Sequence, residues 1–450
     1  DQQSQVPGSR APRVYVHIGE PKTGTTFLQH VLWGNRGRLA DQRVLLPGYT
    51  RRDHSRASRD LRETPRMTSD PADPWVGEWD VLTRQALRTR HAAVISDELL
   101  VACSPQQADR AVRSLSSAEL HIVLTVRDFA GLLPAEWQES VKTRRTVPWE
   151  EWLSDVIDAA PADDRRSRSW FWTAHDTLAT LSMWSGQVPP DRVHVITMPR
   201  HVSSDVLWER FASVLEIDPD GVDLSRARAN SSLGLPETEF LRRMNEALRE
   251  EIPDWYYTRY IKQILAHDVL TEQPRGARLA LPPGREAWAR QQSEVLVAAL
   301  RESKYHFVGD PSELLPEPAA GHYVAPDQQT AEQLVDVAVH AAAVLADARY
   351  REMYPAGPQR RRLASPRQLA SQLKWTMLNG PRTKRALRNA SHLQAVRRLR
   401  VAIWWALMRP TRHRQVVGEH EAGAPAAWLA GGRPGLTGVQ RPPPGDGSAD

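Results

Sequence analysis

Four short apolar segments alternate with stretches of helical periodicity, and this alternation is the strongest constraint on the fold. The apolar segments are typical of buried strands and cover residues 13–19, 92–95, 120–126 and 193–197. Helical spacing of apolar residues recurs between and around them, at 25–38, 76–90, 105–116, 130–143, 171–185 and 204–215. Alternating strands and helices are typical of a mostly parallel sheet covered on both faces. We therefore predict an α/β fold with a doubly wound parallel sheet, and helical additions after residue 230, at 236–250 and 285–304.

Composition divides the chain into five parts. The strands and most helical stretches lie in one expected domain at 13–316. Outside it we expect a disordered N-terminus at 1–12, a linker with an Ala-rich helix at 317–358, a basic helical tail at 359–418, and a disordered Pro/Gly-rich end at 419–450. Segments poor in apolar residues and rich in Pro and Gly do not bury enough surface to fold.

The net charge of +5 is unevenly distributed. Residues 353–418 contain fifteen Lys and Arg and no Asp or Glu, so this segment carries +15 and the rest of the chain carries −10. Trp404 and Trp405 lie among these basic residues, a pattern that suits a helix on an anionic membrane surface. We expect residues 383–414 to make such a contact, or the basic region at 359–414 to dock on the acidic body or to form an oligomer. Arginine clusters also bind nucleic acids, but no recognised module is present and we do not expect that partner.

Cysteine content and hydropathy indicate the compartment. Cys103 is the single cysteine, so no disulfide can form within the chain, and no Cys/His spacing indicates a zinc site. Apolar runs in the sequence stay far below the roughly 18 residues of a membrane-spanning helix. We expect a cytoplasmic protein that is at most peripheral at a membrane.

The first strand runs into a loop, Gly19-Glu-Pro-Lys-Thr-Gly-Thr-Thr26, that precedes a helix. A helix N-terminus after a glycine-containing loop offers unpaired N–H groups and a partial positive charge to an anion. The spacing is P-loop-like, but Thr25 stands where a nucleotide triphosphatase has lysine, and the lysine lies three residues earlier. The alternative is an ordinary turn with polar residues. The expected phosphate ligands are Lys22, Thr23, Gly24, Thr25 and Thr26.

The hexapeptide Pro-Lys-Thr-Gly-Thr-Thr at 21–26 resembles the 5′-phosphosulfate loop of the PAPS-dependent sulfotransferase family (PAPS is 3′-phosphoadenosine 5′-phosphosulfate). A diffuse resemblance to actinobacterial members covers roughly 13–316, and its further segments are 44–48, 95–99, 229–234 and 308–310. The resemblance implies a P-loop-like fold, PAPS as the sulfuryl donor and no metal.

The resemblance also implies a second anchor for the donor. Arg127, at the end of the third strand, occupies the place of the family's 3′-phosphate arginine, although it could instead form a surface ion pair. The family often has a serine eight residues later, where this chain has Ala135, and Ser140 is the expected substitute. Phe27 stands where the family often has a tryptophan that packs on adenine, and a core position is the alternative interpretation.

Sulfuryl transfer needs a group that stabilises the leaving phosphate and a base that activates the acceptor. Lys22 is the candidate for the first role. Glu98 is our first candidate for the base because it follows a strand, and ligand sites in open α/β sheets lie at the strands' carboxyl ends. It could alternatively complement a helix dipole. His54, in an Arg-rich segment interpreted as an acceptor-side loop, is the second candidate, and Glu20 is a third.

We therefore predict transfer of a sulfuryl group from PAPS to a hydroxyl of a small molecule, carbohydrate or glycolipid. One alternative is a nucleotide or small-molecule kinase, with Asp97 as a metal ligand. The other is an inactive family member that acts as an adaptor through its basic tail. The sequence leaves the identity of the acceptor and the oligomeric state open.

Overall fold

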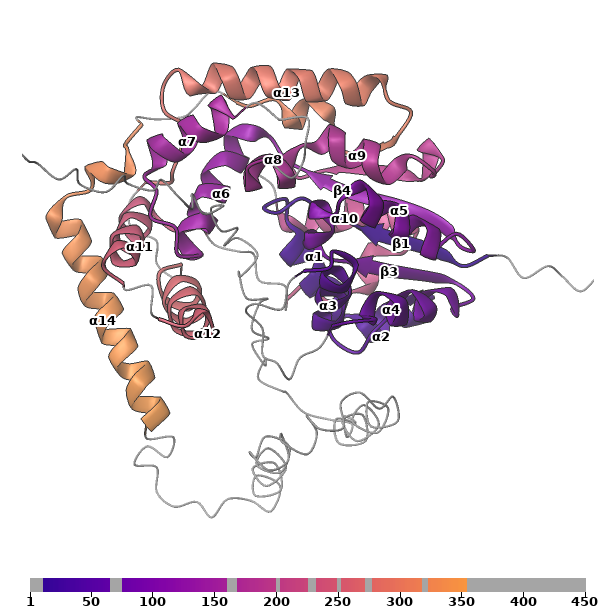
Figure 1. The fold of residues 1–450 in the computed structure, drawn as a ribbon, viewed down its shortest axis with the longest axis horizontal. Helices are drawn as coiled ribbons and strands as arrows, with labels where there is room; N and C mark the ends of the chain where they lie inside the picture. Colours follow the sequence, from indigo (N-terminus) through magenta and orange to yellow (C-terminus); the bar gives the residue numbers. More distant parts are fainter. Residues whose placement is uncertain are drawn as a thin grey trace, which may run out of the picture.

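The computed structural model describes residues 11–64, 75–159, 168–199, 203–225, 232–248, 252–271, 277–317 and 323–353. Within them, one parallel sheet confirms the predicted α/β class, with the strand order β2-β3-β1-β4-β5-β6 (Figure 1). The strands are β1 (Arg13–His17), β2 (Val44–Leu45), β3 (Ala92–Ser96), β4 (Glu119–Val126), β5 (Val193–Thr197) and β6 (His306–Val308). The basic tail lies outside the described residues.

The four central strands are those that the apolar segments predicted, whereas both edge strands were missed. β2 has two residues and β6 has three. Segments this short show no periodicity that separates a strand from a loop. Their pairing with β3 and β5 depends on neighbours that lie far away in the sequence.

Helices cover both faces of the sheet, as a doubly wound fold requires. Along β1, Val14 and Val16 belong to one hydrophobic core, and Tyr15 belongs to the other. On the Tyr15 side lie α1 (Thr25–Gly34) and α10 (Ser204–Leu215). On the opposite side lie α4 (Glu78–Leu87), α5 (Pro105–Ser114) and α9 (Thr177–Ser185). The strands are buried on both faces, which explains why they read as continuous apolar runs.

The remaining helices complete the fold. They are α2 (Arg36–Asp41), α3 (Arg51–Leu61), α6 (Phe129–Lys142), α7 (Trp149–Asp158), α8 (Trp170–His175), α11 (Leu235–Ala247), α12 (Asp254–Tyr256), the π-helix η4 (Tyr257–Val269), α13 (Arg285–Glu302) and α14 (Ala331–Met353). Short 3-10 turns are η1 (Glu98–Ala102), η2 (Pro190–Arg192), η3 (Pro219–Gly221), η5 (Pro311–Leu314) and η6 (Pro326–Gln328). No helix in the described ranges is long and apolar enough to cross a membrane.

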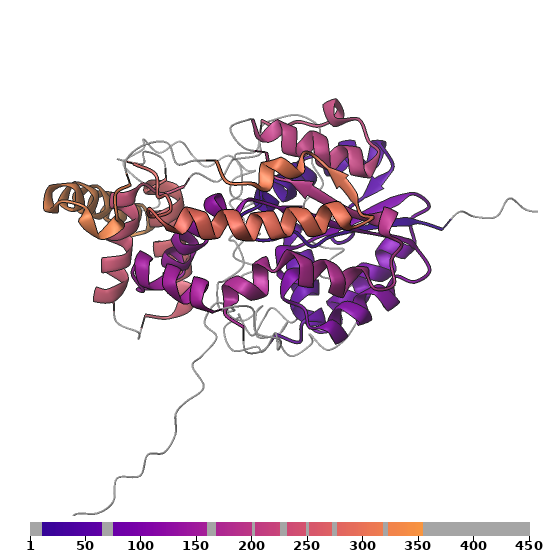
Figure 2. The same ribbon diagram turned by 90° about the horizontal axis from the view of Figure 1, so that it is seen from above.

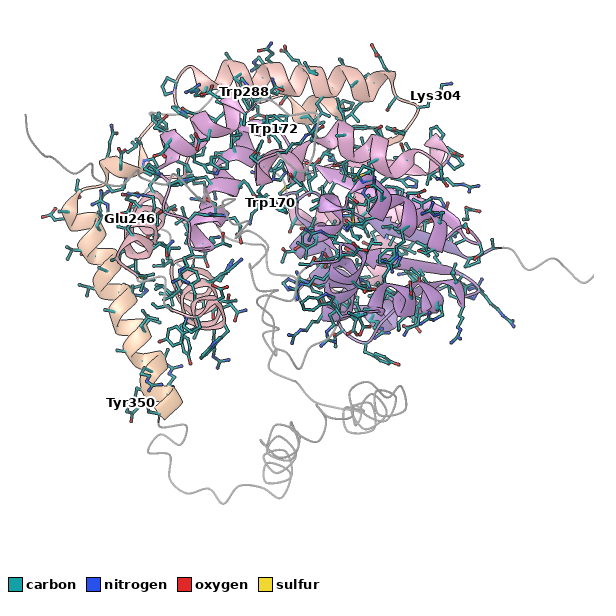
Figure 3. The ribbon with its side chains drawn as sticks, viewed as in Figure 1. Trp170, Trp172, Glu246, Trp288, Lys304 and Tyr350 are labelled. Atoms are coloured by element: carbon teal, nitrogen blue, oxygen red, sulfur yellow. The ribbon has the colours of Figure 1, made fainter. Side chains whose placement is uncertain are left out.

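α13 runs along the molecule from the helical side to the sheet side (Figures 1 and 2). It contacts α6 and also α9. Beneath it, Trp172 of α8 and Trp288 of α13 meet with ring centroids 6.2 Å apart (Figure 3). α13 therefore joins the sheet to the helices that follow α6.

The segment at 51–56, interpreted above as a loop, is the start of α3, and that interpretation was wrong. The Asp53 carboxylate accepts a hydrogen bond from the Thr50 N–H at 3.0 Å and caps the helix. His54, Ala57, Ser58 and Leu61 are buried at helical spacing. The arginines between them masked this periodicity in the sequence.

Candidate functional site

The loop between β1 and α1 has three residues in the left-handed region of backbone conformation. Their φ angles are 53° at Gly19, 64° at Lys22 and 86° at Gly24. A side chain at Gly24 would place Cβ 2.3 Å from the Leu207 side chain, so the loop packs directly on α10. Glycine is required there because it alone adopts this conformation cheaply and leaves that space free. The loop is consequently compact, and it presents the first turn of α1.

The threonines of the loop divide into two roles. The Thr23 hydroxyl is fully buried, donates to the Glu20 carbonyl oxygen at 2.6 Å and lies 2.6 Å from the Thr125 hydroxyl. Its side chain therefore holds the loop on β4, and only its backbone N–H is suited to bind a ligand. Thr25 and Thr26 begin α1, where main-chain N–H groups of the first turn have no partner within the helix.

Arg127 follows β4 and lies against this loop. Its Nη1 donates to the Lys22 carbonyl oxygen at 3.3 Å. A Cβ at Gly131 would come within 2.7 Å of the guanidinium, so that glycine provides the space the arginine occupies. Burial lowers the pKa of Arg127. Burial removes water from the guanidinium, and a bound anion would restabilise its charged form.

Glu98 and Asp97 follow β3, next to the same loop. Gln29 Nε2 of α1 donates to Glu98 Oε2 at 2.7 Å and orients that carboxylate. Asp97 instead accepts from the Leu99 N–H at 2.9 Å and is 6% exposed. Burial, reinforced by the charge of Glu98, raises the pKa of Asp97 to about 7. In the described part of the chain, no group of three or more His, Cys, Asp and Glu is arranged to hold a metal ion.

His54 does not join this site, and its proposed role as the base does not fit the structure. Its ring is fully buried, with Nε2 2.9 Å from the Pro47 carbonyl oxygen and Nδ1 accepting from the Ser96 N–H at 3.1 Å. Burial lowers the pKa of His54 to about 4. Both ring nitrogens are engaged with the backbone, so the histidine joins α3 to β3.

Two further candidates have structural roles in this arrangement. Phe27 is 6% exposed and belongs to the core between α1 and α10, which is the alternative considered above. The Ser140 hydroxyl donates to the Trp137 carbonyl oxygen at 2.7 Å within α6. That hydroxyl proton is used inside the helix, so Ser140 does not replace the missing serine at Ala135 as a donor.

The structure adds a charged cluster that the sequence analysis did not identify. Lys22 Nζ lies 2.5 Å from Glu139 Oε2 of α6, and Lys262 Nζ of η4 lies 2.9 Å from Glu139 Oε1. Lys142 stands one turn after Glu139 and is 6% exposed. Burial opposes the charge of Glu139, but the lysines outweigh it and hold the pKa of that carboxyl well below its usual range.

A second cluster supports the loop from the other side. His175 of α8 lies 3.7 Å from Glu20 Oε2 and 3.6 Å from Glu136 Oε2. Glu20 also accepts from the Thr177 hydroxyl at 2.6 Å and is 1% exposed. Burial would lower the pKa of His175, but the two carboxylates raise it to about 9. Both carboxyl oxygens of Glu20 are thereby engaged in structural contacts, a role unlike that of a base.

No model of a known protein family matches the chain, and no curated protein sequence matches it. Among solved structures, the chain is similar to a sulfotransferase from Alicyclobacillus acidocaldarius, with 17% identity over 48% of this chain and 86% of that chain and a TM-score of 0.32. A similarity at this level carries no inference about activity.

Proposed function

We propose that this protein is a sulfotransferase that moves a sulfuryl group from PAPS to a hydroxyl of a small molecule, carbohydrate or glycolipid. The proposal rests on one juxtaposition. The Lys22 loop, Arg127 and Glu98 follow the neighbouring strands β1, β4 and β3, so all three lie at the carboxyl edge of the sheet. That edge is where open α/β folds bind their ligands.

The residues at this edge suit a donor with anions at both ends. The first turn of α1 and the Lys22 ammonium would bind the 5′-phosphosulfate. Lys22 has three N–H donors, and one is used by Glu139, so two are left for a ligand. Arg127 would bind the 3′-phosphate, for which a guanidinium offers two parallel N–H groups.

In the proposed reaction, the acceptor oxygen forms a bond to sulfur while the bond from sulfur to the 5′-phosphate oxygen breaks. Glu98 takes the proton of the acceptor hydroxyl. Negative charge develops on the 5′-phosphate of the departing 3′,5′-ADP, and Lys22 stabilises it. Positioning and charge stabilisation supply most of the rate in related group transfers.

Calorimetric titration with 3′,5′-ADP, without metal, tests the proposal. We expect saturable binding by the wild type and a loss of about tenfold or more in affinity for both Lys22→Ala and Arg127→Ala, since each removes a charge-assisted hydrogen bond. The absence of binding by the wild type would overturn the proposal. Undiminished binding by Arg127→Ala would remove that residue from the donor site.

The same titration separates the two alternatives. A kinase would bind ATP with magnesium in preference to 3′,5′-ADP. An inactive adaptor would bind 3′,5′-ADP but transfer no sulfate from labelled PAPS to any compound in a metabolite extract. Independently of the sulfotransferase activity, we propose that residues 383–414 contact anionic membranes. Those residues lie outside the described part of the chain.

A further inference from the structure

Three buried or half-buried lysines, Lys22, Lys142 and Lys262, lie near the carboxylate of Glu139. Glu136 and Glu98 also act on Lys22. Lys22 and Lys262 each contact one of its oxygens, at 2.5 and 2.9 Å. The ammonium groups of Lys22 and Lys262 therefore lie on the two oxygens of one carboxylate. The side chains of Lys22, Glu139 and Lys262 retain 22%, 17% and 17% of their exposure. These three side chains are therefore open enough for a ligand to reach.

Lys142 makes the charge of this cluster unbalanced. It is 6% exposed, and no carboxylate of the described residues lies within ion-pair distance of its ammonium. Burial lowers the pKa of Lys142 to about 8, with Glu139 opposing and Lys22 and Lys262 adding to the effect. A buried lysine without a partner is costly, and such groups are normally paired.

Hydrogen-bonding capacity is in excess as well. Each ammonium has three N–H donors. Glu139 occupies one on Lys262, and the free donors of Lys22 are those proposed above for the 5′-phosphosulfate. His267 of η4, also next to the cluster, adds no charge at neutral pH because burial and Lys142 lower its pKa to about 4. The cluster can therefore accept a further anion.

We propose that Lys142 and Lys262 form a subsite for an anionic group, a carboxylate or phosphate, on the acceptor that receives the sulfuryl group. This inference rests on the proposed function. Lys262 lies across Glu139 from Lys22, so an anion held there would keep the rest of the acceptor beside the donor loop. Glu139 occupies the cluster as an internal anion that competes with the ligand. The acceptor class narrows to hydroxyl compounds that carry an anionic group.

Titration of the full-length protein with inorganic phosphate, in the presence of saturating 3′,5′-ADP, tests the subsite. We expect the wild type to bind phosphate, and Lys142→Met and Lys262→Met to bind it about tenfold or more weakly, because each loses one charged donor. Glu139→Gln should bind phosphate more tightly than the wild type because the competing charge is gone. A purely structural role of the cluster predicts no such gain.

Lys304→Met is the matched control, since Lys304 is exposed and lies beyond the end of α13 (Figure 3). It should bind phosphate as the wild type does. Equal phosphate affinity in the wild type, Lys142→Met and Lys262→Met, or no phosphate binding by the wild type, would overturn the subsite and leave 3′,5′-ADP binding intact. Failure of 3′,5′-ADP to bind would instead overturn the proposed function, and phosphate titration of the protein alone would still measure the lysine cluster.

Discussion

Lys22 combines a left-handed backbone, with φ of 64°, and an ammonium paired with a carboxylate of another helix. A non-glycine residue in this conformation costs on the order of 1 kcal/mol. Burial opposes the charge of Lys22, but Glu139 and Glu136 raise its pKa. Its charge is therefore secure at neutral pH, which suits a residue that stabilises an anion and does not exchange protons.

Glu98→Gln tests the assignment of the base. Glutamine preserves the shape and a hydrogen bond to Gln29 but cannot take a proton, so we expect 3′,5′-ADP binding to persist and turnover to fall by about 10²–10⁴-fold. Transfer of ³⁵S from labelled PAPS into a metabolite extract measures the effect. Glu302→Gln, at an exposed position, should be fully active. Wild-type turnover in Glu98→Gln would exclude Glu98 as the base.

Gly131→Ala separates stability from binding at the Arg127 anchor. The new Cβ would stand 2.7 Å from the guanidinium and force it to move, so 3′,5′-ADP affinity should fall about tenfold. The helix itself should gain up to about 1 kcal/mol, because alanine is the better helix former. Calorimetry and urea unfolding give the two values. Gly37→Ala, with nothing within 4 Å of its Cβ, should leave the affinity unchanged.

At the scale of elements, the site is assembled where α6 and α8 meet the β1–α1 loop. α6 begins with the Asp128 cap, whose Oδ1 accepts from the Gly131 N–H at 2.8 Å. Its next turns bring Glu136 to His175 and Glu139 to Lys22. The helix α6 therefore supplies the carboxylates of the ion pairs on both sides of the β1–α1 loop.

His175→Gln should destabilise the protein in a manner that depends on pH. The folded-state pKa of His175 is about 9, whereas an unfolded histidine titrates near 6.5. The stabilisation that the charged His175 gives to the folded state is therefore fully present below pH 6.5 and is lost as pH rises through 9. The difference in melting temperature between wild type and variant should therefore be larger at pH 6.5 than at pH 9.5. A constant difference would show that His175 is not charged. His91→Gln, at an exposed position, is the control.

At the scale of the whole molecule, α13 and the aromatic side chains beneath it connect the sheet with the helical part. Trp172 is 5% exposed, and its Nε1 donates to the Val156 carbonyl oxygen at 2.9 Å. Its ring also lies 6.3 Å from that of Phe129, at the start of α6. The position of α6, and with it the charged cluster, depends on this packing.

Trp172→Ala should cost about 3–5 kcal/mol of stability, the usual range for truncation of a buried tryptophan. Urea unfolding followed by circular dichroism measures it. Trp255→Ala is the matched control, because Trp255 is 64% exposed and surface substitutions usually change stability by less than about 0.5 kcal/mol. Equal losses for the two variants would contradict the role of Trp172 in joining α13 to the sheet.

The sequence by itself determined the four central strands and the loop that precedes α1. Strands buried on both faces are continuous apolar runs, and the loop's two glycines, lysine and threonines lie within eight residues. Arg127 and Glu98 could be placed at the same edge because all parallel strands end there. These features depend on local sequence and on one general rule of α/β sheets.

The tertiary structure alone decided the partners of these residues. Lys22 and Glu139 are 117 residues apart in the sequence, and no periodicity links them. His54 was the second candidate for the base, in a segment interpreted as a loop, but packing of α3 on β3 buries it and engages both ring nitrogens. Burial and long-range pairing are set by how helices pack, and they decide which ionisable groups stay charged and open to a ligand.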